Sequence, residues 1–201
     1  YQKAKSCFEK AIEINPNYVN ALNNLAIRLV SLKDYLNAKN YFEKIIKINP
    51  NLPDVNNNLG IVFNSLNEHQ NAISCFEKEI KINPKHVEAI NNLGAKFQAS
   101  KEYQKAISYY EKVIKIDPNY LQSINNLGTV FQTLKEYQKA TSYYEKVIKI
   151  DPNYTQSLYN LGVIFQSLEE GKKAKSCYEK VIKNNPYHKS ANNNLGVIYK
   201  E

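Results

Sequence analysis

An asparagine recurs every 34 residues along this chain, immediately before a Leu-Gly or Leu-Ala pair. The copies are Asn24, Asn58, Asn92, Asn126, Asn160 and Asn194. The residue before each copy is again asparagine at Asn23, Asn57, Asn91, Asn125 and Asn193, whereas Tyr159 is the exception. Because an asparagine side chain offers both a carbonyl acceptor and an NH₂ donor, it can pair with both polar groups of a peptide unit. The pattern therefore predicts a line of peptide-binding amides, which we call the asparagine ladder.

The repeat distances of an extended ligand and of stacked helices are compatible with this interpretation. An extended chain rises about 3.3 Å per residue, and packed helices lie about 8–10 Å apart. One ladder asparagine would then meet roughly every third ligand residue. Gln98, Gln132 and Gln166 lie nearby in the predicted surface, so the groove is neutral and rich in amides. This favours recognition of a peptide backbone over recognition of charge. The alternative is that asparagine is simply abundant throughout the chain, as in proteins of AT-rich genomes.

Residues that could carry catalysis or bind a metal lack the necessary spacing. His69, His86 and His188 form no metal-ligand pattern with one another or with the cysteines. Cys7, Cys75 and Cys177 share one register position and are at least two repeats apart, beyond disulfide reach. The chain has no Gly-rich phosphate loop, no GxSxG motif and no paired carboxylates. We therefore expect no catalytic residue, no metal site and no cofactor, and hence a chain that is not itself an enzyme.

Composition restricts the class of protein and its partners. The chain has 201 residues, of which 43% are hydrophobic and 23% charged, and its 6 Gly and 7 Pro are too few for an all-β fold. The net charge is +8, but glutamates precede lysines in the order that forms i, i+4 pairs, as in Glu111–Lys115 and Glu145–Lys149. This argues against a nucleic-acid surface. An odd number of scattered cysteines and the lack of a long apolar segment predict an intracellular protein, cytoplasmic or nuclear, without membrane contact.

An internal repeat of 34 residues organises the chain. Six prolines mark it, at Pro16, Pro50, Pro84, Pro118, Pro152 and Pro186. Within residues 87–120, apolar or small residues Ile90, Leu93, Gly94 and Phe97 follow the i, i+3, i+4, i+7 spacing of one helix. A second helix carries Ala106, Tyr110, Val113 and Ile114 and ends before Pro118. Each repeat is therefore predicted to be a pair of helices, A and B, stabilised by packing against its neighbours.

These residues resemble the tetratricopeptide repeat over essentially the whole chain. The signature is a large apolar residue, Leu-Gly, an aromatic, an alanine, a second aromatic and a closing proline. Residues 121–154 match it through Ile124, Leu127, Gly128, Phe131, Ala140, Tyr144 and Pro152, and residues 155–188 through Leu158, Leu161, Gly162, Phe165, Ala174, Tyr178 and Pro186. The resemblance implies an all-α, right-handed α-solenoid superhelix of antiparallel helix pairs, with helices A on the concave face. It also weakens the ladder hypothesis, because asparagine is common at this position in the family.

The register divides the chain into a single solenoid with incomplete ends. A half repeat (helix B) spans 1–18, whole repeats span 19–52, 53–86, 87–120, 121–154 and 155–188, and a half repeat (helix A) spans 189–201. The two half repeats could associate head to tail between molecules. The repeat 53–86 departs from the pattern, with Asn56 at the large apolar position and Glu79 where Val113 and Val147 stand later. Because a buried unpaired carboxylate is costly, we expect Glu79 to be partly exposed or paired with a lysine.

The resemblance implies a protein-interaction module, and the ladder predicts that it binds an extended peptide along the concave groove. Members of the family that bind chaperone carboxylates use a clamp of Lys, Asn and Arg. The corresponding helix A positions here carry Asn20, Asp54, Glu88, Gln122 and Gln156, so the clamp is missing. Two alternatives stay open. The chain is also similar to the substrate-recognition arm of the O-linked N-acetylglucosamine transferases, without their catalytic domain, and it could be a purely structural spacer.

Overall fold

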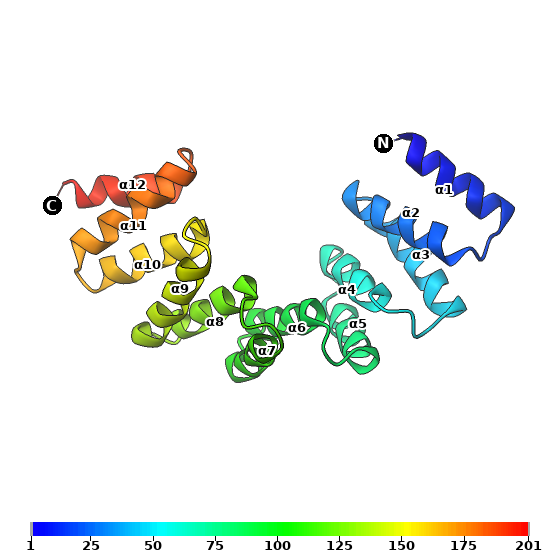
Figure 1. Ribbon diagram of the computed structural model, residues 1–201, viewed down its shortest axis with the longest axis horizontal. Coiled ribbons are helices and arrows are strands. Elements are labelled where there is room, and N and C mark those ends of the chain that lie inside the picture. The colour runs from blue at the N-terminus through cyan, green and yellow to red at the C-terminus, as the bar shows by residue number, and fades with distance from the viewer. Residues whose placement is uncertain (1, 201) are drawn as a thin grey trace. The chain divides into compact units, whose positions relative to one another are not determined.

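The computed structural model describes residues 2–200 and shows an all-α fold in this range, with no β-strand (Figure 1). The helices are α1 Gln2–Ile14, α2 Val19–Ser31, α3 Tyr35–Ile48, α4 Val55–Ser65, α5 His69–Ile82, α6 Val87–Ala99, α7 Tyr103–Ile116, α8 Leu121–Thr133, α9 Tyr137–Ile150, α10 Thr155–Ser167, α11 Gly171–Asn184 and α12 Lys189–Ile198. The predicted all-α fold of helix pairs is confirmed. None of the described helices combines the length and the apolar character needed to cross a membrane.

Local sequence explains where the helices end. The helices that precede the repeated prolines stop at an extended residue, for example Asp117 after α7 and Asp151 after α9. The Asp117 carboxylate then accepts a hydrogen bond from the backbone N–H of Asn119 at 3.0 Å, which stabilises the turn. Helices of the other set end in a residue of left-handed conformation, as at Lys135 (φ 61°). These two alternating ends produce the helix pairs.

The chain forms two compact units, Tyr1–Lys96 and Phe97–Glu201. In the first unit, consecutive helices from α1 to α5 pack against one another, around fully buried side chains that include Leu22, Phe42 and Phe76. In the second unit, consecutive helices from α7 to α12 pack in the same way. One cluster of its core contains Tyr110, Leu127 and Tyr144.

Ion pairs on the surface of the second unit differ from the pairs expected from sequence. The glutamate that precedes a helix pairs with the lysine three residues later, as in Glu102–Lys105 (2.5 Å) and Glu136–Lys139 (2.6 Å). The expected Glu111–Lys115 and Glu145–Lys149 pairs are not within 4.0 Å in the described chain. A glutamate at a helix start is also favoured by the partial positive charge of that end, which explains the alternative choice.

Candidate functional site

The ladder asparagines differ in their exposure. Asn24 is exposed, whereas Asn58, Asn92, Asn126 and Asn194 are half-buried and Asn160 is buried. The residues that precede them are on average deeper. Asn57, Asn91 and Asn125 are buried, Asn23 is half-buried, and Asn193 is exposed.

Tyrosine hydroxyl groups hold the ladder asparagines of the second unit. The Asn194 side chain donates to the Tyr178 hydroxyl at 3.1 Å, and hydrogen bonding with Asn126 and Asn160 acts to lower the pKa of Tyr110 and Tyr144. In each pair the tyrosine lies sixteen residues before the asparagine. The unit therefore repeats one arrangement three times.

Each of these tyrosines also donates its own proton to a glutamine. The hydroxyl groups of Tyr110, Tyr144 and Tyr178 lie 2.7, 2.7 and 2.9 Å from the Oε1 atoms of Gln98, Gln132 and Gln166. A phenol has one donor and can accept at its oxygen, so the glutamine takes the proton and the oxygen accepts from asparagine. The resulting Gln–Tyr–Asn rows are uncharged and fixed in orientation.

In the first unit the tyrosine is replaced by phenylalanine. Phe42 and Phe76 occupy the corresponding register position and offer no hydroxyl group. Asn92 instead donates to the Oδ1 atom of the buried Asn57 at 3.1 Å. The residue before the ladder position can thus link neighbouring repeats, and Asn125 does so as well by accepting from the Ser157 hydroxyl at 2.9 Å.

Burial keeps these phenols neutral. It raises the pKa of Tyr144 to about 12, although hydrogen bonds with Thr129 and Asn160 act in the opposite direction. Burial likewise raises the pKa of Tyr110 and of Tyr178. At physiological pH the hydroxyl groups can therefore donate to glutamine and accept from asparagine at once.

This burial makes stability depend on alkaline pH. Since the folded state holds the Tyr144 pKa above the ordinary value of 10, the proton it retains stabilises the fold fully below pH 10. That contribution is lost as the pH rises through about 12, and we expect a loss of about 2 kcal/mol for this residue. Urea unfolding at neutral pH and near pH 12 measures it. The variant Tyr144→Phe should show a smaller loss than the native chain, and an equal loss would contradict the assignment.

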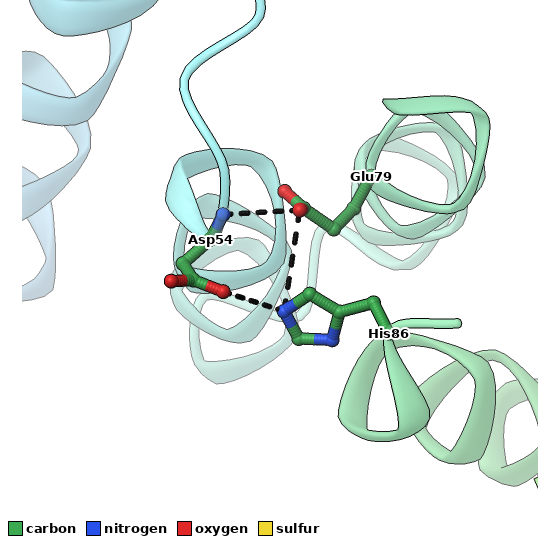
Figure 2. Close-up of side chains that lie close together, drawn as sticks. All are labelled: Asp54, Glu79 and His86. Carbon is green, nitrogen blue, oxygen red and sulfur yellow. Dashed lines mark hydrogen bonds and ion pairs between the residues drawn. The ribbon is translucent and has the colours of Figure 1, made fainter. Parts of the chain in front are cut away.

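A cluster of three ionisable side chains lies in the first unit (Figure 2). Asp54 immediately precedes α4, Glu79 lies in the last part of α5, and His86 lies in the loop before α6. Glu79 is fully buried, and its carboxylate accepts from the backbone N–H groups of Asp54 at 3.0 Å and Asn57 at 3.3 Å. A side chain from α5 thus caps the N-terminus of α4, where backbone donors lack partners within the helix.

The expectation that Glu79 is partly exposed or paired with a lysine is wrong. Its partners are backbone N–H groups, with the His86 Nε2 atom 4.0 Å away. The physical reason is the late start of α4, which begins at Val55 after Pro53 and a left-handed Asp54 (φ 69°). The Asp54 side chain does not cap the first backbone N–H groups of this shortened helix. They are therefore available to Glu79.

His86 completes the cluster in one defined tautomer. Its Nδ1 atom accepts from the backbone N–H of Ala89 at 3.2 Å, which caps α6, while its Nε2 atom lies 2.7 Å from the Asp54 carboxylate. Because Nδ1 acts as an acceptor, the neutral ring carries its proton on Nε2 and donates it to Asp54. His188 caps α12 in the same way through Ala191, at 3.1 Å.

The donor types in this cluster are those that bind transition metals, and the ligand atoms lie within 4.8 Å of one another. The hydrogen bonds do not favour such use. A metal bound at Nε2 of His86 would need the lone pair of that atom. Because Nδ1 accepts from the Ala89 N–H, Nε2 carries the ring proton instead. Both Glu79 carboxylate oxygens already accept hydrogen bonds from backbone N–H groups. The arrangement is therefore a closed capping unit for α4 and α6. The sequence pattern marks Glu79 as a departure from the repeat, but it does not indicate that the three residues lie together.

A hollow of about 500 Å³ joins this cluster to the ladder. Asn58 and Asn57 line it together with Asp54 and His86. Lys85 and Glu88 provide opposite charges at its edge. The ladder residue Asn58 thus lies beside a polar, hydrogen-bonded wall.

Comparisons with known proteins agree with this geometry. Family models described as tetratricopeptide repeat match residues 7–39, 53–86, 87–120, 122–154 and 155–188. No curated protein matches the sequence. Among solved structures, MamA 41-end from Desulfovibrio magneticus RS-1 is similar with a TM-score of 0.74 and 22% identity, over 85% of this chain and 96% of that one.

Two further structures have the same fold. PilF of Pseudomonas aeruginosa has a TM-score of 0.79 and 17% identity, over 90% of this chain and 88% of that one. YrrB, described as a TPR protein with an unusual peptide-binding site, has a TM-score of 0.69 and 22% identity, over 92% of this chain and 95% of that one. At these identities the likeness concerns the fold alone.

Proposed function

Because the chain belongs to the tetratricopeptide repeat family, we propose that it is a non-catalytic interaction module that binds an extended peptide through the asparagine ladder. The fold supports a protein-interaction scaffold. The observation that carries the finer proposal is the hydrogen bond from the ladder residue Asn194 to the buried Tyr178 hydroxyl, with Asn126 and Asn160 at the same register relative to Tyr110 and Tyr144. Such a bond orients the amide before a ligand arrives, and fixing a contact in advance lowers the entropic cost of binding.

The neutral chemistry of the rows supports recognition of a peptide backbone. An asparagine held through one N–H still has further hydrogen-bonding capacity in its amide. Glutamine, phenol and asparagine carry no charge, and the chaperone-type clamp of Lys and Arg is absent from the sequence. The ligand class is therefore an extended polypeptide segment whose side chains matter less than its amide groups. A peptide-binding site in YrrB, a protein of the same fold, is compatible with this function.

The proposal divides the predicted site into two sets with different roles. The ladder position, including Asn58, Asn126 and Asn194, would contact the ligand. The preceding position, including Asn57 and Asn125, would orient neighbouring repeats through the hydrogen bonds already described.

The test compares two pairs of asparagines that lie close to each other in sequence. A phage-displayed library of unstructured dodecapeptides is selected on the native chain, and the Kd of the best peptide is measured by calorimetry. We expect Asn126→Ala with Asn160→Ala to weaken binding at least tenfold, since two preoriented amides are lost. The matched control is Asn119→Ala with Asn153→Ala, which removes exposed loop asparagines and should leave the Kd unchanged.

Two results would count against the ladder. Unchanged affinity in the Asn126→Ala, Asn160→Ala variant, with its helical circular dichroism intact, would contradict the ladder and favour a purely structural spacer. Binding that disappears at high salt would show that charge dominates recognition, contrary to the neutral rows.

A further inference from the structure

The repeats differ at one position that faces an aromatic side chain. In repeats 87–120 and 121–154, a phenylalanine of the first helix stacks on a tyrosine of the second. The ring centroids of Phe97 and Tyr109 are 5.4 Å apart with an interplanar angle of 5°, and those of Phe131 and Tyr143 are 5.5 Å apart at 3°. In repeats 53–86 and 155–188 the phenylalanine is retained, but cysteine replaces the tyrosine.

In repeat 121–154 the stacked tyrosine lies between helices. Tyr143 lies in the second helix of its repeat, beside Phe131 and close to Glu111 of α7, the helix that precedes α8. Burial raises the pKa of Tyr143, and the nearby Glu111 carboxylate raises it further. A phenol ring is therefore the native filling of this crevice.

The corresponding crevice of repeat 53–86 is open. A pocket of about 310 Å³ lies between α3, α4 and α5, and its lining includes Phe63, Cys75, Leu59 and Glu43. By register, Phe63 corresponds to Phe131 and Glu43 to Glu111. In repeat 155–188 a pocket of about 370 Å³ shares the equivalent residues Phe165 and Glu145, but Cys177 does not line it. We call the first of these cavities the Cys75 pocket.

Cys75 contributes space and apolar surface to the pocket. Its side chain is buried, and burial raises the pKa of the thiol to about 11. The sulfur is therefore a neutral thiol at physiological pH, which is a poor nucleophile and a poor metal ligand. The floor, made by Phe63, Leu59 and Cys75, suits a flat apolar group.

The edge of the pocket carries an excess of positive charge. Lys47 and Lys78 are exposed there, opposite a single carboxylate at Glu43. An aromatic group with an acidic neighbour complements this edge, because the carboxylate meets an ammonium group while the ring is removed from water. None of the ladder asparagines lines this pocket.

From the internal comparison we propose that the Cys75 pocket is a second binding site, which accepts an aromatic side chain of a partner protein flanked by an acidic residue. Repeat 121–154 shows that a ring carried on a polypeptide fits between the phenylalanine and the preceding helix. The exposed edge at Ser74 and Lys78 leaves room for the backbone that carries such a ring. The site is independent of the peptide function proposed for the ladder.

The test uses defined probes and a variant that fills the crevice. The ring signals of ¹³C-labelled phenylalanine are followed by NMR while acetyl-Glu-Tyr-Glu-amide is added. We expect saturable shifts at Phe63, weaker binding by several fold for acetyl-Lys-Tyr-Lys-amide, and no shift for acetyl-Glu-Ala-Glu-amide. Cys75→Tyr, which restores the residue of the stacked repeats, should abolish the Phe63 response.

Matched variants keep the test decisive. Cys177→Tyr, at the same register in repeat 155–188, should leave the Phe63 response unaffected. Cys75→Leu should weaken the Phe63 response by partial filling if the tyrosine variant does not fold. Persistence of the Phe63 shifts in folded Cys75→Tyr would overturn the proposal. Equal binding of the alanine peptide would do the same. Tighter binding of free 4-methylphenol than of the tyrosine peptide would assign the pocket to a small aromatic molecule. It would overturn the proposal that a partner protein's side chain binds there.

Discussion

Replacing Glu79 by alanine is expected to lower the free energy of unfolding by about 3 kcal/mol, because it removes the cap of α4. The carboxylate is fully buried and accepts from the backbone N–H groups of Asp54 and Asn57. Hydrogen bonds to a charged acceptor contribute more than neutral ones, and a buried donor left without a partner is costly. Urea unfolding of the native and variant chains measures the loss.

Two further substitutions separate capping from burial. Glu77→Ala removes an exposed carboxylate of the same helix and should change stability by less than about 0.5 kcal/mol. Glu79→Val installs the residue that Val113 and Val147 represent in later repeats. If the carboxylate were only a buried charge, valine would stabilise the protein. We expect destabilisation instead, and a Glu79→Val chain as stable as the native one would refute the capping role.

The helix pairs could be predicted from sequence because each repeat contains local signals for the ends and the apolar faces of its helices. Prolines such as Pro84 stop one helix, and the residues Ile90, Leu93 and Phe97 give the next helix an apolar face of helical spacing. These signals are local and recur at a constant interval, so one repeat checks another. The structure confirms the all-α fold that they indicate.

The capping cluster could not be predicted in the same way because it joins three segments. The sequence shows Glu79 as a departure from the repeat, and His86 shares its register position with His188. Sequence spacing does not show that α4 starts late or that its backbone donors point at α5. Only the three-dimensional packing of α4 against α5 makes the buried carboxylate a cap.

The ladder was visible as a line of residues, but its supports were not. Tyr110, Tyr144 and Tyr178 occupy the second aromatic position of the repeat signature, and each is fully buried. Their hydroxyl groups matter equally, because they connect a glutamine of one helix with the asparagine of the next repeat. The exchange of Phe76 for tyrosine in later repeats was the available signal. The interval of sixteen residues between each tyrosine and its ladder asparagine has no meaning until the helices are packed.

Close packing around these rings leads to the second large expected effect. A Cβ atom added at Gly128 would lie 2.7 Å from the Cε1 atom of Tyr144, nearer than non-bonded atoms tolerate. The ring cannot retreat easily, because its hydroxyl group is held by Gln132 and Thr129. We expect Gly128→Ala to lower the free energy of unfolding by about 2 kcal/mol, despite a gain of up to about 1 kcal/mol in helix propensity. Urea unfolding provides the measurement.

A glycine with open surroundings provides the control for this effect. A Cβ atom at Gly196 in α12 would meet no atom within 4 Å, so Gly196→Ala should stabilise the chain or leave its stability unchanged. The anchoring of the ring can be tested separately, since Tyr144→Phe removes the hydroxyl group and lets the ring move. In that background Gly128→Ala should cost less than in the native chain, which a double-mutant cycle reports as a coupling energy. Equal costs in both backgrounds would show that the hydrogen bonds of Tyr144 do not hold the ring against Gly128.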